Sequence, residues 1–224
     1  MNPVGGPDNP LGDSRALHHD RSMSPTLVLE CSSSRSSWAL VDGGNVLAEG
    51  HTTGRASGAF FSSLEGSWPR GIRPAHILVG VGPGSFSGIR VAIAAATGMA
   101  RAWNCPVTPI RSTHALARKH ADAAVLGIFS DAKRGQLFFT AYAHGQMTQP
   151  SRLIARNELG DFLAKCSLAL SLDPLEGVPG SEYPGAVDLA GAWQESGGEP
   201  GLPLEPIYLH TDVVNPVKTS APRS

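Results

Sequence analysis

The glycine-rich segment Gly82–Gly88 (GPGSFSG) partly matches the glycine-containing motifs of known binding and catalytic loops. It lacks the lysine of a phosphate-binding P-loop, and its outer glycines lie one residue too far apart for that motif. Ser87 stands where a dinucleotide-binding loop has its third glycine, and Phe86 stands where a nucleophile elbow has its serine. We therefore predict no catalytic residue here. The segment is interpreted as a structural turn, with Ser87 capping the following helix, made of Gly82, Pro83, Gly84, Ser85, Phe86, Ser87 and Gly88.

A strand and a helix are predicted to hold this turn in place. Residues 77–81 form a short apolar run with β-branched members, which is typical of a buried strand. Residues 89–103 contain strong helix formers and no proline. Because residues 92–100 carry no charge, this helix lacks the polar face of an ordinary surface helix. We expect one side of the helix to pack on its own sheet and another side to be covered by something else.

Composition and cysteine spacing exclude several other classes of protein. The net charge is −1, with 18 basic and 19 acidic residues, which does not favour a globally basic nucleic-acid binder. Cys31, Cys105 and Cys166 lie far apart without metal-ligand spacing, so buried thiols in a reduced compartment are expected. No run approaches the length of a membrane span, and no signal-peptide core follows Met1. We predict a cytoplasmic protein with no metal, no cofactor and no membrane contact.

The remaining apolar patterns predict an α/β protein flanked by disordered ends. Residues 1–24 and 215–224 are polar and rich in turn-forming residues, so both are expected to be disordered tails, with Met23 a plausible start. Strands are predicted at 26–30, 36–41, 46–51, 106–110, 125–130, 136–143, 152–155, 168–172 and 203–209. Further helices are predicted at 55–68, 112–122, 157–166 and 186–195.

Four segments together resemble the TsaB (YeaZ) family. The stretch GPGSFSGIR at 82–90, followed by an Ala/Gly-rich helix, is similar to the family signature GPGSFTGLR. Residues 27–41 resemble the family's opening hairpin, and residues 131–138 resemble its D-A-R-x-x-E-V-Y segment. Residues 206–210 resemble its closing P-x-Y-L-R, and all four segments occur in the family's order.

The resemblance implies two small actin-like domains of the ASKHA superfamily, which are ribonuclease H-like and have mixed sheets with flanking helices. Residues 25–105 would form the N-terminal domain and would carry the partner-binding helices. Residues 106–206 would form the C-terminal domain, and residues 207–214 would be an arm that returns to the first domain.

Members of the family are non-catalytic paralogues of TsaD. The resemblance implies an accessory subunit that supports TsaD in threonylcarbamoyl transfer to the adenosine beside the anticodon of tRNA. The direct partner would be a TsaD-like paralogue or a second copy of the chain. A TsaE-type ATPase would join through the complex, and tRNA would be contacted only indirectly. Two helices would form a four-helix bundle with the partner through Phe60, Phe61, Leu64, Arg90, Val91, Ala92, Ala95, Gly98 and Met99.

Several positions depart from the family pattern. Glu30-Cys31 replaces Asp-Thr at the end of the first strand, and Ser87 replaces Thr. Gln136 replaces Glu, and His210 replaces Arg, which removes a permanent charge from the closing motif.

These departures keep two alternative functions open. In the superfamily the strand-end acid handles the metal–phosphate unit of ATP, so Glu30 is either a remnant of that role or an acid paired with nearby backbone or solvent. One alternative is a glycoprotease-like or ATP-binding enzyme that uses Glu30 or Asp131, and the other is a diverged homodimeric scaffold. The helix at 55–68 lacks the two histidines at i, i+4 that hold the metal in the catalytic paralogues, which argues against metal-dependent chemistry.

Overall fold

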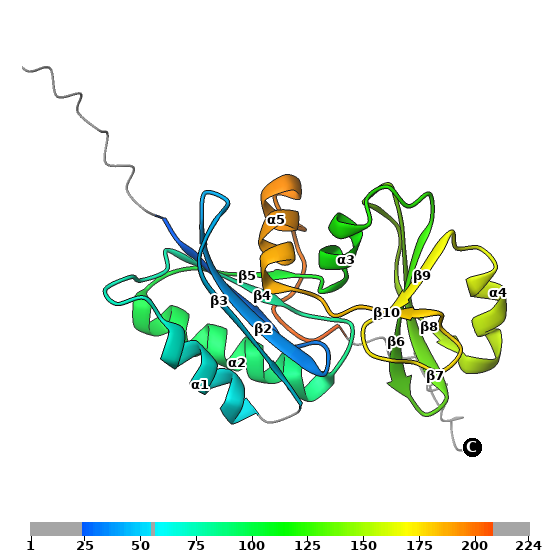
Figure 1. Cartoon of the computed structure of the whole chain (residues 1–224), viewed down its shortest axis with the longest axis horizontal. Coiled ribbons are helices and arrows are strands. Elements are labelled where there is room, and N and C mark those ends of the chain that lie inside the picture. The colour runs from blue at the N-terminus through cyan, green and yellow to red at the C-terminus, as the bar shows by residue number, and fades with distance from the viewer. Residues whose placement is uncertain (1–23, 55–56, 208–224) are drawn as a thin grey trace, which may run out of the picture.

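A computed structural model of the chain describes residues 24–54 and 57–207. Two five-stranded mixed sheets lie side by side, each with helices against it (Figure 1). The first sheet has the order β3-β2-β1-β4-β5, formed by β1 (Thr26–Glu30), β2 (Arg35–Asp42), β3 (Asn45–Thr53), β4 (His76–Gly80) and β5 (Val107–Ile110). The second has the order β10-β9-β6-β7-β8, formed by β6 (Leu126–Lys133), β7 (Gln136–Ala143), β8 (Gln146–Ala155), β9 (Leu168–Ser171) and β10 (Gly180–Ser181).

The two sheets repeat one layout. In the first, β1 pairs antiparallel with β2 and parallel with β4. In the second, β6 pairs antiparallel with β7 and parallel with β9. Each sheet is therefore an antiparallel meander extended by parallel strands, and the predicted α/β architecture with mixed sheets is confirmed.

Helices cover both faces of the first sheet. On one face, α1 (Ser57–Ser67) and α2 (Phe86–Trp103) pack against β1 residues Leu27 and Leu29. On the other face, Val28 belongs to the apolar cluster that contains α3 (Thr113–Lys119) and α5 (Ala186–Ser196). Because successive side chains of a strand point to opposite faces, full burial of all three residues explains why β1 is a continuous apolar run.

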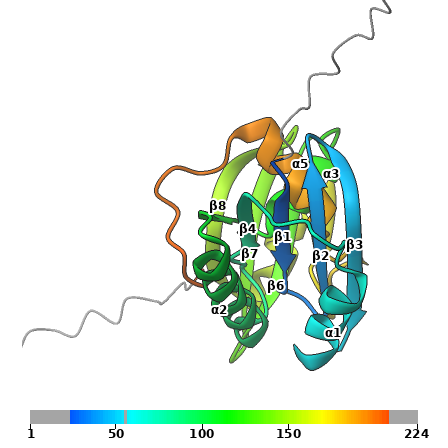
Figure 2. The same cartoon turned by 90° about the vertical axis from the view of Figure 1, so that its left-hand side faces the viewer.

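The layer of α3 and α5 joins the two sheets (Figures 1 and 2). Its cluster also includes Ile128 and Tyr142 of the second sheet, so the two sheets share one core across this layer. The outer face of the second sheet is covered by α4 (Leu159–Leu163), which follows a short 3₁₀ turn, η1 (Arg156–Glu158). There Phe162 packs against Phe139 with the ring centroids 4.8 Å apart.

The sheet topology corrects the predicted domain boundary. The sequence interpretation placed residues 106–206 in the second domain. However, β5 pairs with β4 and is the edge strand of the first sheet. Helix α5 also contacts β1 and β2. The first unit therefore includes β5 and recruits α5 from the end of the chain.

Local elements differ from the predictions in the second half. β8 is 10 residues long, because a hairpin turn with positive φ at His144 and Gly145 returns the chain earlier than predicted. β10 lies in a segment interpreted as loop, and the predicted helix at 157–166 is helical only from η1 to the end of α4. No strand forms over residues 203–207, where the Ile207 N–H donates to the Val81 oxygen over 2.9 Å.

The segment after α5, orange in Figure 2, runs along the outside of the molecule to reach Val81. The predicted tails and most of the predicted arm at 207–214, including His210, lie outside the described residues. Among the residues that are described, no helix is both long and apolar enough to cross a membrane.

Candidate functional site

The glycine turn packs directly on the end of β1. The backbone N–H of Ser85 donates to the carbonyl oxygen of Ser32 over 2.6 Å. A Cβ added at Gly84 would lie 2.1 Å from that same oxygen, and one at Gly88 would lie 2.1 Å from the Cys31 oxygen. Gly82 and Gly84 also have φ values of 96° and 149°, which side chains rarely adopt. The glycines therefore allow the turn to approach the strand more closely than any other residue could.

The start of α2 differs from the prediction in its capping. The helix begins at Phe86 with Ser85 as the N-cap residue, and Ser85 makes no capping bond with its side chain. The predicted Ser87 cap is therefore wrong, because Ser87 already lies in the first turn. A serine from another element stabilises the turn instead: Ser112 Oγ accepts the Gly82 N–H over 3.0 Å.

The structure places three of the predicted partner-binding residues in the chain's own core. Phe60, Leu64 and Ala92 are buried in the cluster that contains Leu27 and Leu29 of β1. They face the sheet, so they cannot be direct contacts for a partner in this conformation. The other predicted residues are at least partly accessible: Phe61, Val91, Ala95 and Met99 are half-buried, and Arg90 and Gly98 are exposed.

The exposed side of α2 forms a stripe that the sequence interpretation largely missed. Arg90, Ala94, Thr97 and Arg101 are exposed and recur at the three- and four-residue spacing of one helix face. The sequence does not show which alanines face the sheet; the structure buries Ala92, Ala96 and Ala100, which leaves this stripe on the opposite side of the helix. The Arg90 guanidinium lies 5.2 Å from the ring centroid of Phe86, which is 43% exposed.

The middle of this stripe is small and lacks charge. The Thr97 hydroxyl donates to the Ile93 oxygen over 2.8 Å, which leaves its methyl group to the surface. A Cβ at Gly98 would meet nothing within 4 Å. Another backbone could therefore approach α2 closely here, between the charged groups of Arg90 and Arg101.

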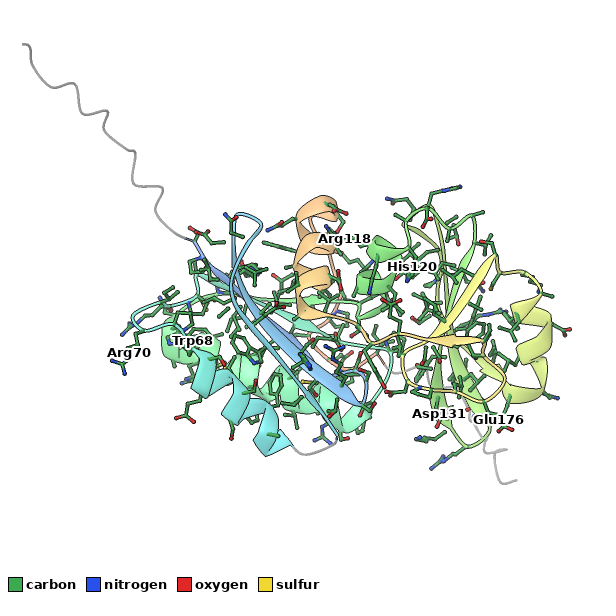
Figure 3. The ribbon with its side chains drawn as sticks, viewed as in Figure 1. Trp68, Arg70, Arg118, His120, Asp131 and Glu176 are labelled. Atoms are coloured by element: carbon green, nitrogen blue, oxygen red, sulfur yellow. The ribbon has the colours of Figure 1, made fainter. Side chains whose placement is uncertain are left out.

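Two tryptophans close the far end of the α1–α2 layer. The rings of Trp68 and Trp103 stack with centroids 5.4 Å apart and planes 15° apart. Trp68 Nε1 donates to the Ile72 oxygen over 3.0 Å, which fixes the loop after α1 (Figure 3). The ring stack therefore joins the loop after α1 to the C-terminal end of α2.

A cavity of about 520 Å³ lies where the two sheets meet. Ser32, just after β1, and Ser130 and Asp131, near the end of β6, line it together with the start of α2. Burial raises the pKa of Asp131, but hydrogen bonds from Lys133 more than offset this and hold that pKa below its usual value. Asp173, also in the lining, accepts hydrogen bonds from the N–H and hydroxyl of Ser34 at 2.8 and 2.5 Å.

The candidate catalytic acid Glu30 is fully buried at the end of β1. Its Oε1 accepts the Ser32 N–H over 2.5 Å, and burial raises its pKa. The neighbouring Cys31 thiol is also buried, and this burial is the main reason why its pKa rises to about 12. Within residues 24–54 and 57–207, no group of three or more His, Cys, Asp or Glu could hold a metal ion.

Comparison with known proteins supports the resemblance seen in the motifs. Residues 73–180 match the family described as tRNA N6-adenosine threonylcarbamoyltransferase (TsaD). A comparison with curated proteins yielded no match. YeaZ from Pseudomonas aeruginosa is 20% identical and aligns over 84% of this chain and 100% of its own, with a TM-score of 0.61. A protein described as similar to peptidase YEAZ from Pseudomonas aeruginosa aligns with the same identity and coverage and a TM-score of 0.62.

The alignment with YeaZ covers 84% of the chain, and the described residues form two mixed sheets with flanking helices, so the predicted fold of two small α/β units is confirmed. The resemblance indicated by the sequence motifs is likewise confirmed: the chain has the fold of the TsaB (YeaZ) family and, over residues 73–180, the sequence pattern of the TsaD family.

Proposed function

We propose that this chain is a TsaB-type accessory subunit in tRNA modification, which docks onto a TsaD-type threonylcarbamoyltransferase. The YeaZ fold and the TsaD-family match at 73–180 support this role. The docking face consists of the accessible residues of α2 that point away from the first sheet: Arg90, Val91, Ala94, Ala95, Thr97, Gly98 and Arg101. The small, uncharged middle of this face is the observation that carries the proposal.

The docking face suits a partner helix. Two helices pack with their axes about 8–10 Å apart, and small residues favour the short end of that range. Ala94, Thr97 and Gly98 supply such a surface over about one turn of α2. An interface of ordinary size buries about 800 Å² on each partner. The accessible side of α1, including half-buried Phe61, would extend the contact toward that area.

The two arginines give the docking face an orientation. Arg90 and Arg101 lie at opposite ends of the uncharged stripe, where carboxylates of a partner could pair with them at the rim. Rim charges mainly raise the association rate and exclude wrong registers, and salt screens their effect. In this proposal a TsaE-type ATPase and tRNA meet the chain only through the assembled complex.

The chain acts by docking, and the reacting groups belong to the partner. Glu30, the residue that the resemblance places at the ATP-handling position, is fully buried and bonded to the Ser32 N–H. A carboxyl in that position cannot reach a ligand without rearrangement of the end of β1. This geometry supports an accessory subunit over an enzyme that uses Glu30.

Binding of the matching TsaD-type protein tests the proposal. We expect a complex with one copy of each chain, measured by size-exclusion chromatography with light scattering and by isothermal titration. Ala94→Glu places a charge in the middle of the docking face and should weaken binding at least tenfold, which corresponds to about 1.4 kcal/mol. Gln194→Glu, an exposed change on α5 at the opposite face of the sheet, is the matched control and should leave affinity unchanged.

Two outcomes would overturn the proposal. Equal affinity for wild type and Ala94→Glu would show that the docking face is elsewhere. Self-association that Ala94→Glu abolishes, with no binding to the TsaD-type protein, would favour the homodimeric scaffold instead.

A further inference from the structure

Glu30 is an ionisable group enclosed beneath the glycine turn. Its side chain ends against β4, where a Cβ added at Gly80 would lie 1.9 Å from Glu30 Oε2. Only glycine at position 80 leaves room for the carboxyl group. Oε2 is buried and has no hydrogen-bond partner among the described residues. The carboxyl group therefore fills a closed space between β1 and β4 rather than lining an open site.

A chain of hydrogen bonds runs from this carboxyl group to the start of α2. Oε1 of Glu30 accepts the Ser32 N–H over 2.5 Å. The carbonyl oxygen of Ser32 then accepts the N–H of Ser85 over 2.6 Å, and Ser85 is the N-cap residue of α2. The position of the carboxyl group thus fixes Ser32, and Ser32 fixes the first turn of the helix.

Ser112 lies beside the Glu30 carboxyl group and also binds Gly82 at the start of the glycine turn. A Cβ at Gly80 would lie 2.9 Å from Ser112 Oγ as well as close to the carboxyl group, so the hydroxyl and the carboxyl group are neighbours. Ser112 also exchanges two hydrogen bonds with Gly82, as its Oγ accepts the Gly82 N–H and its own N–H donates to the Gly82 oxygen. Gly82 and Ser85 of the glycine turn are therefore both hydrogen-bonded to residues that neighbour this carboxyl group.

Within the described part of the chain, no cation pairs with Glu30. Its facing groups are the hydroxyls of Ser112 and Ser32, the backbone N–H of Ser32, and Ser37, which lies opposite Glu30 on β2. The nearest titratable neighbour is the Cys31 thiol, which is itself buried and uncharged. No ion pair to Glu30 forms among the described residues. An unpaired carboxylate is costly to bury, so the neutral acid is the form that fits.

We propose that Glu30, as a neutral acid, is the positioning residue for the glycine turn and the first turn of α2, and that ionisation of its carboxyl group loosens both. The direction of the pKa supports this, because burial raises it above its usual value although the neighbouring Ser32 and Ser112 lower it. An acid with a raised pKa in the folded state contributes stability at low pH. That stability is lost as the pH rises from the unfolded-state pKa through the folded-state pKa. The inference concerns the start of the docking face, but it does not depend on the proposed partner.

The test compares wild type with Glu30→Gln by urea unfolding from about pH 4 to about pH 9. The amide keeps the acceptor oxygen at nearly the same size and cannot ionise. We expect the unfolding equilibrium constant of wild type relative to Glu30→Gln to rise with pH, by up to tenfold per pH unit, until the folded-state pKa is passed. Glu176→Gln, at an exposed glutamate, should give a profile parallel to that of wild type.

Hydrogen exchange locates the effect. After correction for intrinsic rates, amides of residues 82–90 should lose protection at high pH in wild type but not in Glu30→Gln. Amides of α5 should respond equally in both proteins. Parallel stability profiles for wild type and Glu30→Gln would overturn the inference, as would equal protection of residues 82–90 at every pH. Neither measurement uses a partner, so failure of the docking proposal would leave the result for Glu30 standing.

Discussion

Asp173 and Ser34 join the two sheets beside the cavity that lies between them. Asp173 follows β9 in the second sheet, and its Oδ1 accepts both the N–H and the hydroxyl of Ser34, which precedes β2 in the first sheet. A short side chain after one strand thus anchors the turn before another, and it lies close to the start of α2. The relative placement of the two sheets should therefore depend on this carboxylate.

Removal of that carboxylate should loosen the molecule. Asp173→Ala leaves the Ser34 N–H and hydroxyl without their acceptor, at a cost of about 1–3 kcal/mol in the free energy of unfolding. Urea unfolding would measure the loss, with Glu176→Gln as a nearby exposed control. Hydrogen exchange should also rise around residues 32–36. An unchanged midpoint together with unchanged exchange would show that the contact does not hold the sheets together.

The two glycines Gly84 and Gly98 should respond to alanine in opposite ways. At Gly84 a Cβ would lie 2.1 Å from the Ser32 oxygen, and an alanine there would have to adopt a backbone φ of 149°. We therefore expect Gly84→Ala to destabilise the fold by at least about 2 kcal/mol. At Gly98 a Cβ meets open space inside a helix, so Gly98→Ala should stabilise the isolated chain by about 1 kcal/mol. Thermal unfolding of both variants checks the pair. Destabilisation by Gly98→Ala would contradict the described exposure.

Gly98→Ala separates folding from docking. The added methyl group lies on the docking face, where it would keep a partner helix from its closest approach. We expect Gly98→Ala to weaken binding of a TsaD-type partner even though the isolated chain becomes more stable. Titration of both proteins against the same partner makes the comparison. Tighter binding by the variant would place the partner helix away from Gly98.

The segment that follows α5 should be released at low pH. Glu199 accepts hydrogen bonds from Arg111 Nε at 2.7 Å and His114 Nε2 at 2.6 Å. Burial raises the pKa of Glu199, but these two partners lower it more, so the pKa lies below its usual value. A lowered pKa means that the contribution is present above the unfolded-state pKa of about 4.3 and is lost as the pH falls through the folded-state pKa.

Glu199→Gln tests this pH dependence. At neutral pH the variant should be less stable than wild type by about 1–3 kcal/mol, because hydrogen bonds to a charged group are lost. The difference should shrink below about pH 4, where wild type also loses the charge. Urea midpoints across this range give the measurement. A difference that is constant with pH would show that the ionised carboxylate is not what fixes the segment.

The sequence predicts the first sheet better than the second, for a physical reason. Strands buried on both faces, such as β1 and β4, are continuous apolar runs with clear ends. β8 is an edge strand whose less exposed positions include the polar residues Gln149 and Ser151, so its apolar period of two is weak. The two-residue strand β10 carries almost no pattern. Edge strands take their conformation from the neighbouring strand, which one sequence does not reveal.

The docking helix shows a similar limit. The absence of charge predicts that α2 has two covered sides, but it does not say which residues face the sheet. Ala92 and Ala95 have the same residue type, yet the first is buried against β1 and the second is half-accessible. The rotation of α2 about its own axis as it packs on the sheet decides which of these alanines is buried. The role of Ser112 at the glycine turn was also unpredictable, because 30 residues separate it from Gly82.

The most direct test of the central claim is a hydrogen-exchange footprint of the full chain with and without a TsaD-type partner. The account predicts that binding protects amides within residues 88–102 and the accessible side of α1. It also predicts that α5 and the β8 edge remain unchanged. Protection confined to α5, to β8 or to the cavity between the sheets, with α2 unaffected, would contradict it.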